Sequence, residues 1–495
     1  MMERPAPPAG PYLVAGLARS GQAAARALAA HAGPGAVVGW DERDSERTRR
    51  AVRDLAAAGV RCELGSDGTA LLDGAGCVVK SPGIAPTVPL LARAARLGLP
   101  VLDELELGWR LDRRPTVAVT GTNGKSTVAE LVRAVLDRAG MRPAVAGNTT
   151  FGPPLSGLPA QAADLVVAEV SSYQLEACPA FLPDVAVVTN LSVDHLERHG
   201  DLRAYGEVKR RIALREDAVA PAVVIGADGA YGRSLARDCE ARGAAVTAYG
   251  RHRAAGHRLE GRRWAHGRAE LDVRAAGERL ELVTRLPGEH NARNALGALA
   301  IADVLEVPRE VTLDALAAAS APPGRLEVVD EGQPFDVLVD YAHNPEGIRA
   351  SLRAGRDLLG GRPGSSLRVV ACALSVLVTR QRREMGRAAA EEADDLVLTT
   401  DRVRPGDPVH ELPPGLAEGA RRAGGCEVVP DRVDALATTL RRARPGDVVM
   451  VLGRGDRRLA VDARGRRADL DDREEVRRIL RQLVARPSVS GPGAG

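Results

Sequence analysis

A glycine-containing loop between an apolar strand and an amphipathic helix constrains the fold of this chain more than any other feature. The loop reads TGTNGKST and covers residues 120–127. The apolar run 116–119 before it predicts a buried strand. After the loop, apolar side chains recur at the spacing of one helix face: Val128, Leu131, Val132, Val135 and Leu136. A strand, a glycine loop and a helix in this order predict an α/β fold with a parallel sheet.

The chemistry of this loop predicts that it binds the phosphates of ATP or GTP. Such loops surround phosphates with backbone N–H donors and the positive end of a helix dipole. Lys125 would contact the outer phosphates, and the hydroxyl of Ser126 would bind magnesium. The strict pattern has a further glycine where this chain has Val119. The alternative is a glycine turn with an exposed lysine, but the flanking strand and helix favour a phosphate loop.

Lysine is scarce in this chain. Its 68 basic residues are arginines except for Lys80, Lys125 and Lys209. Lysine is a compact point charge whose amine can be neutralised by burial and then act as a nucleophile, whereas arginine keeps its charge. We therefore expect that some of these positions resist arginine. The sequence gives Lys80 no compulsory role, and an exposed surface lysine is expected there.

Charge and aromatic content argue against a nucleic-acid binder. The net charge is +3 and aromatic residues make up 2 % of the chain, too few for a protein that stacks bases on aromatic rings. The arginine-rich stretches 251–263 and 457–467 are interpreted as solvated loops and not as nucleic-acid patches.

Cysteine usage and the apolar runs indicate a cytoplasmic protein. No C-x-x-C pair occurs among the cysteines, which favours free thiols over a disulfide frame or a zinc site. They are Cys62, Cys77, Cys178, Cys239, Cys372 and Cys426. The first residues lack the apolar core of a signal peptide. No apolar run reaches the length of about 18 residues that a membrane span needs.

Strand and helix patterns alternate in three successive regions. They predict domains at residues 1–114, 115–322 and 323–495, with boundaries in the polar and proline-containing segments around 111–115 and 321–324. Four apolar runs predict strands of the last domain: 337–340, 367–372, 395–399 and 448–452.

The first region begins as a βαβ unit suited to a nucleotide. A strand over residues 12–15 leads into the loop Gly16–Gly21, a helix to about residue 31, and a second strand that ends at Asp41. An acidic residue at that place can meet a ribose or a base. NAD is an alternative ligand, but the glycine spacing is G-x-x-x-x-G and not the G-x-G-x-x-G of dehydrogenases.

Polar side chains follow two apolar strands beyond the phosphate loop. The run 165–170 carries Glu169, and a carboxylate there is costly unless it is paired or binds a metal. The next apolar run leads to Asn190 and His195. Parallel strands end at one edge of a sheet, where ligands bind, so these side chains are expected to face Lys125. His195 taken alone would be a structural histidine, but within this cluster a functional role is favoured.

Several motifs carry a family resemblance when they are taken together in order. The central region contains TGTNGKST, EVSSYQLE, TNLSVDHLERHG and Y-x-x-x-K at residues 205–209. The loop Gly16–Gly21 with Asp41, the turn Ser81-Pro82-Gly83-Ile84, and HNARNA at residues 290–295 extend over most of the chain. The sequence resembles the Mur ligase family, most closely its MurD branch. The resemblance implies a Rossmann-like N-terminal domain, a P-loop central ATPase domain with a parallel sheet, and a Rossmann-like C-terminal domain.

The resemblance implies an ATP-dependent amide ligase. Family members make an acyl phosphate from a carboxylate substrate and ATP, and the amine of an amino acid attacks it. In many of them a lysine at the place of Lys209 is carbamylated by carbon dioxide and becomes a magnesium ligand. Arginine cannot replace this lysine because its guanidinium stays protonated. ATP and Mg²⁺ are the implied cofactors.

The resemblance also assigns individual residues. The implied catalytic residues are Lys125, Glu169, His195 and Lys209. The implied magnesium ligands are Ser126, Glu169, His195 and Lys209. The implied ATP contacts are Gly121, Thr122, Asn123, Gly124, Lys125, Ser126, Thr127, Asn291, Asn294, Arg325 and Asp340. The implied contacts to a UDP-linked acceptor are Ser20, Asp41, Ser81, Gly83 and Asn148.

The third region departs from the MurD pattern. Residues 340–345 read DYAHNP where MurD enzymes have DSKATN, which is similar to the MurE and polyglutamate-forming branches. Residues 400–404 lie where those enzymes read the incoming amino acid, and Arg404 is expected to bind its carboxylate. The alternative for Arg404 is a solvated loop cation. Because this domain selects the amino acid, D-glutamate stays open even where the acceptor half matches.

The favoured function is addition of D-glutamate to UDP-N-acetylmuramoyl-L-alanine in peptidoglycan precursor synthesis. One alternative is a family member that joins another amino acid to a UDP-muramoyl or other carboxylate, for instance in specialised metabolism. A non-enzyme alternative is an ATP-binding partner protein with a degenerate third domain, against which the intact catalytic set argues. The expected partners are the small-molecule substrates, with no nucleic acid and no membrane, and a monomer is expected.

Overall fold

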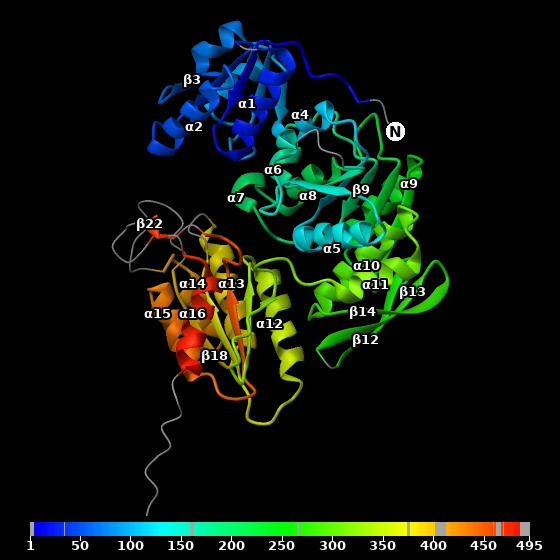
Figure 1. The fold of residues 1–495 in the computed structure, drawn as a ribbon, viewed down its shortest axis with the longest axis vertical. Coiled ribbons are helices and arrows are strands. Elements are labelled where there is room, and N and C mark those ends of the chain that lie inside the picture. Colours follow the sequence, from blue (N-terminus) through cyan, green and yellow to red (C-terminus); the bar gives the residue numbers. More distant parts are fainter. Residues whose placement is uncertain are drawn as a thin grey trace, which may run out of the picture. The chain divides into compact units, whose positions relative to one another are not determined.

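The chain forms three mostly parallel β-sheets with helices between the strands (Figure 1). The computed structural model describes residues 4–33, 35–158, 163–265, 267–373, 377–400, 412–458, 460–461, 467–468 and 470–485. The predicted α/β class is confirmed. Alternating strands and helices produce it, because a parallel strand pair needs a crossover connection that is usually a helix.

The chain divides into two compact units. The first contains Met1–Leu191, Arg203–Arg258 and Leu296–Ala315, and the second contains Ser192–Leu202, Leu259–Ala295 and Leu316–Gly495. The three domains expected at residues 1–114, 115–322 and 323–495 stay a prediction. Two short segments of the central region, 192–202 and 259–295, group with the last region.

The first sheet has the strand order β3-β2-β1-β4-β5, and neighbouring strands in it are parallel. Its strands are β1 (Tyr12–Ala15), β2 (Val37–Asp41), β3 (Arg61–Leu64), β4 (Cys77–Lys80) and β5 (Val101–Asp103). Its helices are α1 (Arg19–Ala32), α2 (Glu46–Ala56), η1 (Thr69–Gly74), α3 (Pro89–Arg96) and α4 (Glu104–Leu111). The strand β1 is buried along its whole length. Parallel pairing brings the loop after β1, Asp41 and Ser81 to one edge of the sheet.

The second sheet carries the phosphate loop. In the first unit its order is β7-β8-β6-β9-β10-β11. These strands are β6 (Thr116–Thr120), β7 (Pro143–Gly147), β8 (Leu165–Glu169), β9 (Val185–Val188), β10 (Ala222–Gly226) and β11 (Ala245–Gly250). The register pairs Val119 with Glu169 and Thr120 with Val188, so the polar residues after β8 and β9 flank the loop after β6.

The remaining elements of the central region follow in chain order. The helices are α5 (Lys125–Arg138), η2 (Leu155–Gly157), α6 (Ser172–Leu175), α7 (Leu196–His199), α8 (Leu202–Arg210), α9 (Ala230–Ala241), α10 (Glu289–Val304) and α11 (Arg309–Ala318). The strands are β12 (His257–Ala265), β13 (Arg268–Ala275) and β14 (Glu278–Thr284). The last two form an antiparallel pair.

The third sheet has the order β15-β16-β20-β17-β18-β19. Its strands are β15 (Glu327–Val328), β16 (Asp336–Asp340), β17 (Leu367–Ala371), β18 (Asp395–Leu398), β19 (Glu427–Val428) and β20 (Val448–Leu452). Its helices are α12 (Pro345–Leu359), α13 (Thr379–Glu392), α14 (Leu416–Ala423), α15 (Arg432–Arg442) and α16 (Asp472–Val484). A separate antiparallel pair joins β21 (Ala460–Val461) to β22 (Arg467–Ala468). The four strands expected from apolar runs are present as β16, β17, β18 and β20.

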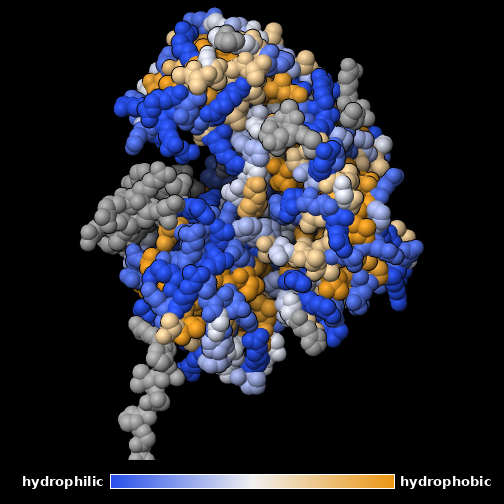
Figure 2. Space-filling model, in the orientation of Figure 1, coloured by the Kyte–Doolittle hydropathy of each residue, from blue (hydrophilic) through white to orange (hydrophobic). Residues whose placement is uncertain are grey.

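Hydrophilic and hydrophobic residues are interspersed on the face drawn in Figure 2. Within the described ranges, no helix is both long and apolar enough to cross a membrane. All six cysteines are free thiols, as expected from their spacing.

Candidate phosphate loop and acceptor loop

Two glycines give the loop after β6 its shape. Gly121 has a φ of +147° and Gly124 a φ of +85°, backbone conformations that favour glycine. A Cβ on Gly121 would overlap the hydroxyl of Thr189. Gly124 is the N-cap of α5, so Lys125, Ser126 and Thr127 form the first turn of that helix. The first turn of a helix directs its backbone N–H groups out of the helix N-terminus, which is the arrangement that binds phosphate there.

The ammonium of Lys125 lies over this loop. Its Nζ donates to the carbonyl oxygens of Gly121 at 3.1 Å and Thr122 at 3.0 Å. Both acceptors belong to the loop itself, so the positive charge is held at the mouth of the loop. The predicted position of Lys125 beside a bound phosphate agrees with this geometry.

Side chains from the end of β9 hold the loop in place. Asn190 accepts from the backbone N–H of Asn123 at 2.9 Å and donates from Nδ2 to the carbonyl of the same residue at 3.0 Å. The hydroxyl of Thr189 donates to that carbonyl at 2.7 Å. Asn190 was expected to face Lys125, and the structure places it on the loop as a clamp. Thr189 lies in the apolar run before Asn190, and its role there was not evident from the sequence.

Ser126 and Glu169 place two oxygen atoms side by side. The Ser126 hydroxyl donates to Oε2 of Glu169 at 2.7 Å, and the side chains are 6 % and 3 % exposed. Glu169 is the last residue of β8, next to β6 in the sheet. Hydroxyl and carboxylate oxygens are ligands that Mg²⁺ accepts, and a buried carboxylate favours a cation nearby. This pair therefore fits the predicted magnesium site.

Lys209 reaches the same loop from α8. The side chain is 1 % exposed, and Nζ donates to the carbonyl of Gly121 at 2.8 Å. The ammonium also lies 4.5 Å from the ring centroid of Tyr205, one helical turn earlier. The predicted lysine is thus buried against the phosphate loop. A longer, planar guanidinium would have to displace Tyr205 or the loop carbonyl.

His195 belongs to the second compact unit. It has a left-handed backbone, with a φ of +52°, and precedes α7. Its ring lies 3.4 Å from Glu197 and 3.8 Å from Asp194, and its side chain is 33 % exposed. His195 is the one predicted magnesium ligand that lies outside the first unit.

The neighbouring carboxylate of Asp194 ties this segment to the third sheet. Asp194 is 1 % exposed and accepts from Asn344 Nδ2 and from Gln381 Nε2, each at 3.2 Å. Burial alone would raise the pKa of Asp194, but His343, His195 and the two amide donors outweigh it and hold the pKa below its ordinary value. Burial lowers the pKa of His343 to about 4.

The predicted adenine-nucleotide contacts also lie in the second unit. Asn291 donates from Nδ2 to the carbonyl of Pro287 at 2.9 Å, and Asn294 donates to Asn291 Oδ1 at 3.0 Å. Asp340 accepts from the backbone N–H groups of Leu326 and Ala342 at 2.7 and 2.8 Å. Asp340 therefore organises the loop after β16. Its contact with ATP stays a prediction.

Arg325 stacks on an aromatic ring at the start of the third region. Its guanidinium lies 4.3 Å from the ring centroid of Tyr341, and that of Arg457 lies 4.7 Å from the same centroid. A planar guanidinium stacks on an aromatic face in a way that lysine does not. Arg404, which was predicted to contact the amino acid, lies outside the described residues.

The loop after β1 is closed by packing and by neighbouring strand ends. Gly16 has a φ of +89°, and a Cβ on Gly21 would overlap the carbonyl of Gly16. Ser81 donates from Oγ to that carbonyl at 2.8 Å. Asp41 accepts from the backbone N–H of Leu17 at 2.8 Å. The structure thus brings Asp41 and Ser81 to the glycine loop, and their role in an acceptor site stays a prediction.

The other predicted acceptor contacts are Ser20, Gly83 and Asn148. Ser20 is in the first turn of α1 and is half-buried, and Gly83 is exposed in the turn after β4. Asn148 is exposed, and its backbone N–H donates to the carbonyl of Glu169 at 2.8 Å. The segment that carries Asn148 is thus fastened to the end of β8.

Arg19 links the loop after β1 to this segment, and the sequence did not single it out. Its guanidinium donates to the carbonyl of Thr149 at 3.0 Å and also to that of Gly152. A cation in the first turn of a helix is disfavoured by the helix dipole. That unfavourable position at the start of α1 is the signal in the sequence that Arg19 has another partner.

Two family models match this chain. The Mur ligase middle domain matches residues 119–302, and the Mur ligase, glutamate ligase domain matches residues 324–455. Together they cover more than half of the chain. This chain belongs to the Mur ligase family. The resemblance stated from the motifs is confirmed.

Relatives of this Mur ligase act on different amino acids. A UDP-N-acetylmuramate–L-alanine ligase of Streptomyces avermitilis is 32 % identical over 428 residues, which are 85 % of this chain and 89 % of that protein. A UDP-N-acetylmuramoylalanine–D-glutamate ligase of Pelotomaculum thermopropionicum is 32 % identical over 455 residues, 89 % of this chain and 91 % of that protein. The crystal structure of the UDP-N-acetylmuramate–alanine ligase MurC from Thermotoga maritima has a TM-score of 0.60 at 20 % identity, and the match covers 96 % and 99 % of the two chains.

The Mur ligase is therefore an enzyme, an ATP-dependent ligase of peptidoglycan precursor synthesis that acts on small molecules. The alternative of a non-catalytic partner protein is not supported. The amino acid that it adds does not follow from the family, because the relatives differ in it.

One prediction about this Mur ligase is wrong. Lys80 is not a surface lysine: it is 1 % exposed and forms an ion pair with Asp103 at 3.0 Å. It ends β4 opposite Asp103 in the register of β4 and β5. No charged partner precedes it at helical or strand spacing in the sequence, so only the pairing of β4 with β5 reveals the ion pair.

Glu104 is a second buried carboxylate at this place in the Mur ligase. It is fully buried, and Oε1 accepts from the backbone N–H of Ser156 at 2.6 Å. Burial raises the pKa of Glu104 to about 7. The adjacent Asp103 has its pKa raised to about 6, also by burial, in spite of Lys80. These two groups titrate near neutral pH.

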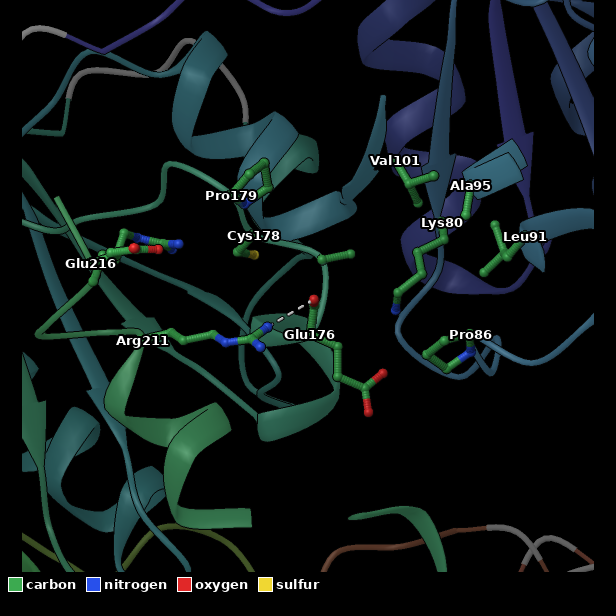
Figure 3. A pocket seen from close by; sticks show the side chains of 12 residues that line it. Lys80, Pro86, Leu91, Ala95, Val101, Glu176, Cys178, Pro179, Arg211 and Glu216 are labelled. Carbon is green, nitrogen blue, oxygen red and sulfur yellow. Dashed lines mark hydrogen bonds between the residues drawn. The ribbon is translucent and has the colours of Figure 1, made fainter. Parts of the chain in front are cut away.

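A cavity of about 530 Å³ borders Lys80. Figure 3 shows Lys80, Pro86 and Leu91 on one side of it, and Cys178 and Arg211 on the other. Its walls are mainly apolar on the side of α3.

Proposed function

We propose that this Mur ligase adds D-glutamate to UDP-N-acetylmuramoyl-L-alanine. The observation that carries the proposal is the loop Gly16–Gly21, closed by Ser81 from the turn after β4 and by Asp41 from β2. This arrangement has an acidic residue for a ribose or base and no lysine, which suits a nucleotide used as a handle and not as a phosphate donor. The relative with 91 % of its length matched is a D-glutamate ligase.

The residues around the phosphate loop have separate tasks in this proposal. The carboxylate of the acceptor attacks the outer phosphorus of ATP, and ADP leaves. Lys125 and the first turn of α5 bind the outer phosphates and stabilise the charge that develops on them. Asn190 and Thr189 keep the loop in the binding conformation, because they fix the peptide of Asn123.

Ser126 and Glu169 would hold Mg²⁺ on the phosphates, and carbamylated Lys209 with His195 would hold a second ion near the acceptor carboxylate. Bound Mg²⁺ neutralises negative charge, so that a carboxylate and a phosphate can approach. The ammonium of Lys209 first loses one proton, and the neutral amine then joins carbon dioxide and releases a second proton. The cation thereby becomes an anionic carbamate. The ring of Tyr205 at 4.5 Å would then line this anionic group.

In the second step the amine of the amino acid attacks the acyl phosphate. A tetrahedral intermediate forms, the amine loses a proton, and phosphate leaves to give the amide. The third domain supplies the amino-acid contacts in this proposal, with Arg404 as the predicted partner of the amino-acid carboxylate.

A second candidate is the same reaction with another amino acid. The string DYAHNP supports it, because His343 and Asn344 contact Asp194 beside His195 in place of the residues that the D-glutamate branch has there. The relative that adds L-alanine is equally identical, at 32 %. The acceptor would then differ together with the amino acid.

A matrix of substrates decides between the candidates. Phosphate release is measured with UDP-N-acetylmuramic acid or UDP-N-acetylmuramoyl-L-alanine as acceptor, each with D-glutamate, L-glutamate, L-alanine, glycine or diaminopimelate. We expect turnover with UDP-N-acetylmuramoyl-L-alanine and D-glutamate above every other pair. A higher kcat/KM with any other pair would reject D-glutamate as the substrate.

We also propose that the enzyme works as a cytoplasmic monomer. Its UDP-linked substrates and its free thiols support this location. Light scattering of the purified full chain tests the oligomeric state, and a dimer mass would reject the proposal.

A further inference from the structure

Lys80 is held by two acceptors in a desolvated place. Its Nζ donates to Oδ2 of Asp103 at 3.0 Å and to the backbone carbonyl of Tyr173 at 3.3 Å. The side chains of Lys80 and Asp103 are 1 % and 0 % exposed. Asp103 in turn accepts from the backbone N–H of Leu105 at 3.0 Å, which fixes the start of α4. A buried ammonium with two acceptors holds the segments that carry them at a set separation.

On one side, Lys80 directly precedes the turn 81–84, which closes the loop after β1, the predicted acceptor loop. The backbone N–H of Ser81 donates to the carbonyl of Ala15 at 2.8 Å, and its hydroxyl donates to Gly16. The backbone N–H of Ile84 donates to the carbonyl of Ser81 at 3.0 Å and closes the turn. A displacement of Lys80 therefore moves Ser81 relative to the loop after β1.

On the other side, Tyr173 belongs to a segment that is bonded to the phosphate loop. Tyr173 is in α6, which begins three residues after Glu169. Ser171 caps this short helix by accepting from the N–H of Gln174. Thr120, the residue before Gly121, donates from its hydroxyl to the carbonyl of Val170 at 2.8 Å. A continuous path of bonded atoms thus runs from Lys80 to the phosphate loop.

We propose that Lys80 is a positioning residue, which sets the distance between the turn 81–84 and the phosphate loop. It touches no reacting atom. It acts through Ser81 on the acceptor loop and through Tyr173 on the end of β8. The inference rests on the proposed function only in taking the turn 81–84 as an acceptor contact.

A second buried ion pair beside Lys80–Asp103 provides a comparison. Apart from Lys125 and Lys209, arginine supplies the other basic side chains, including one in a second buried pair at the same helix: Arg110 with Glu106, at 2.7 Å and 9 % and 0 % exposed. Glu106 accepts from the backbone N–H of Phe181 at 2.7 Å, so this pair also joins α4 to the central region. Neither Arg110 nor Glu106 is adjacent in sequence to a residue that forms or closes a glycine loop.

Lys80→Met tests the proposal, with Arg110→Met as the matched control. Both remove the cation of a buried pair at α4, so both are expected to lower the melting temperature. Only Lys80→Met is expected to lower kcat, by about tenfold to a hundredfold, because small misplacements of reacting groups are costly. Its KM for ATP is expected to stay within about twofold, since the contacts of Lys125 are untouched. Equal kinetic changes in the two variants would overturn the proposal.

Lys80→Arg is the conservative variant. Lys80 borders the cavity drawn in Figure 3. A guanidinium has enough donors to bond both acceptors of Lys80, Asp103 and Tyr173. We expect Lys80→Arg to recover most of the kcat that Lys80→Met loses. No recovery in a folded Lys80→Arg variant would contradict the link through these two acceptors. If Lys80→Met does not fold, the double variant Lys80→Met with Asp103→Asn removes both charges and carries the same expectation.

Amide hydrogen exchange of the enzyme without substrates separates this inference from the proposed function. The N–H groups of Ile84 and Gln174 are expected to exchange at least about tenfold faster in Lys80→Met and at wild-type rates in Arg110→Met. Unchanged exchange at both positions would overturn the positioning role. Failure of UDP-N-acetylmuramoyl-L-alanine as a substrate would reject the proposed function and leave this exchange result to decide on Lys80.

Discussion

The loops after β1 and after β6 have the same local design but different partners. Each joins the end of a buried parallel strand to the N-terminus of a 14-residue helix. Gly16 has a positive φ in the first loop, and Gly121 and Gly124 have positive φ in the second. The loop after β1 is closed by Ser81 and by the carboxylate of Asp41. The loop after β6 is clamped by Asn190 and carries two ammonium groups on the carbonyl of Gly121, those of Lys125 and Lys209.

A strand, a glycine loop and a helix do not by themselves specify a ligand. Glycines allow the backbone to turn and to approach a ligand closely in both loops. Charge distinguishes them: the first loop faces a carboxylate, whereas the second faces two cations and the Ser126–Glu169 pair. The partners come from neighbouring strand ends, so the ligand is selected by the sheet and not by the loop alone.

The largest effect is expected from Lys125→Ala, which removes the lysine in the first turn of the helix that follows the second loop. Phosphate release with ATP should fall by about a thousandfold or more, because charge that develops on the transferring phosphate is left without its lysine. The control is Arg133→Ala on the same helix, whose partners Glu130 and Asp137 are at the surface. It should keep activity. Near wild-type release by Lys125→Ala would remove the difference between the two loops.

Substitutions of Lys209 are expected to have the next largest effect. They test whether this lysine acts as a carbamate and not only as a cation. Lys209→Ala should lose about a hundredfold in kcat and regain part of it with formate or acetate, which can replace the oxygens of a carbamate at a metal. Lys209→Arg should be inactive and not be rescued, because the guanidinium keeps its positive charge beside Tyr205. An active Lys209→Arg variant would show that carbamylation is not required.

Asn190→Ala should weaken the second loop only. It removes two hydrogen bonds to the peptide of Asn123, each worth about 1 kcal/mol, so kcat/KM for ATP should fall about tenfold or more. The KM for the acceptor should be unchanged. Substrate-by-substrate kinetics check this, and an equal loss for both substrates would mean that the two loops do not work separately.

Ser81→Ala is the reciprocal change in the first loop. It removes one hydrogen bond, to the carbonyl of Gly16, and should raise the KM for the UDP-linked acceptor about fivefold. The KM for ATP should stay constant. If ATP binding changes instead, the acceptor assignment of the first loop is wrong.

Glu104→Gln should have the smallest effect on turnover and a measurable effect on stability. Burial raises the pKa of Glu104 from an ordinary 4.5 to about 7. The folded protein therefore holds the proton of Glu104 more tightly than the unfolded chain does. The stability that this protonation contributes is fully present below about pH 4.5 and is lost as the pH rises through about 7. At pH 8 the variant should be more stable than the wild type by about 2–3 kcal/mol, and at pH 4.5 about equal.

Thermal unfolding at several pH values measures this difference. Glu474→Gln serves as the control, because its side chain is 65 % exposed and it should leave the pH profile unchanged. A constant difference between Glu104→Gln and the wild type at every pH would mean that Glu104 does not titrate in the folded protein.

Local sequence predicted the elements of this enzyme well. The strand before the phosphate loop, the loop itself and the helix after it could be read from residues 116–136 because hydrophobic period and glycine placement are local properties. The parallel order of strands then placed Glu169 and Asn190 beside the loop, since strands of a parallel sheet end at one edge.

The ion pair of Lys80 could not be read in this way. Its partner Asp103 is 23 residues further along the chain, and the two meet only because β4 pairs with β5. Arg19 and Glu104 depend in the same manner on the segment 148–158, which no period or motif connects to them.

The sequence by itself therefore determined the fold class, the phosphate loop and the family, because these depend on patterns within short segments. The tertiary structure alone decided which buried charges meet, which side chains close each glycine loop, and that residues 192–202 pack with the third sheet. The physical reason is that a buried charge is stable only beside a partner, and the partner is chosen by the pairing of distant strands and not by sequence spacing.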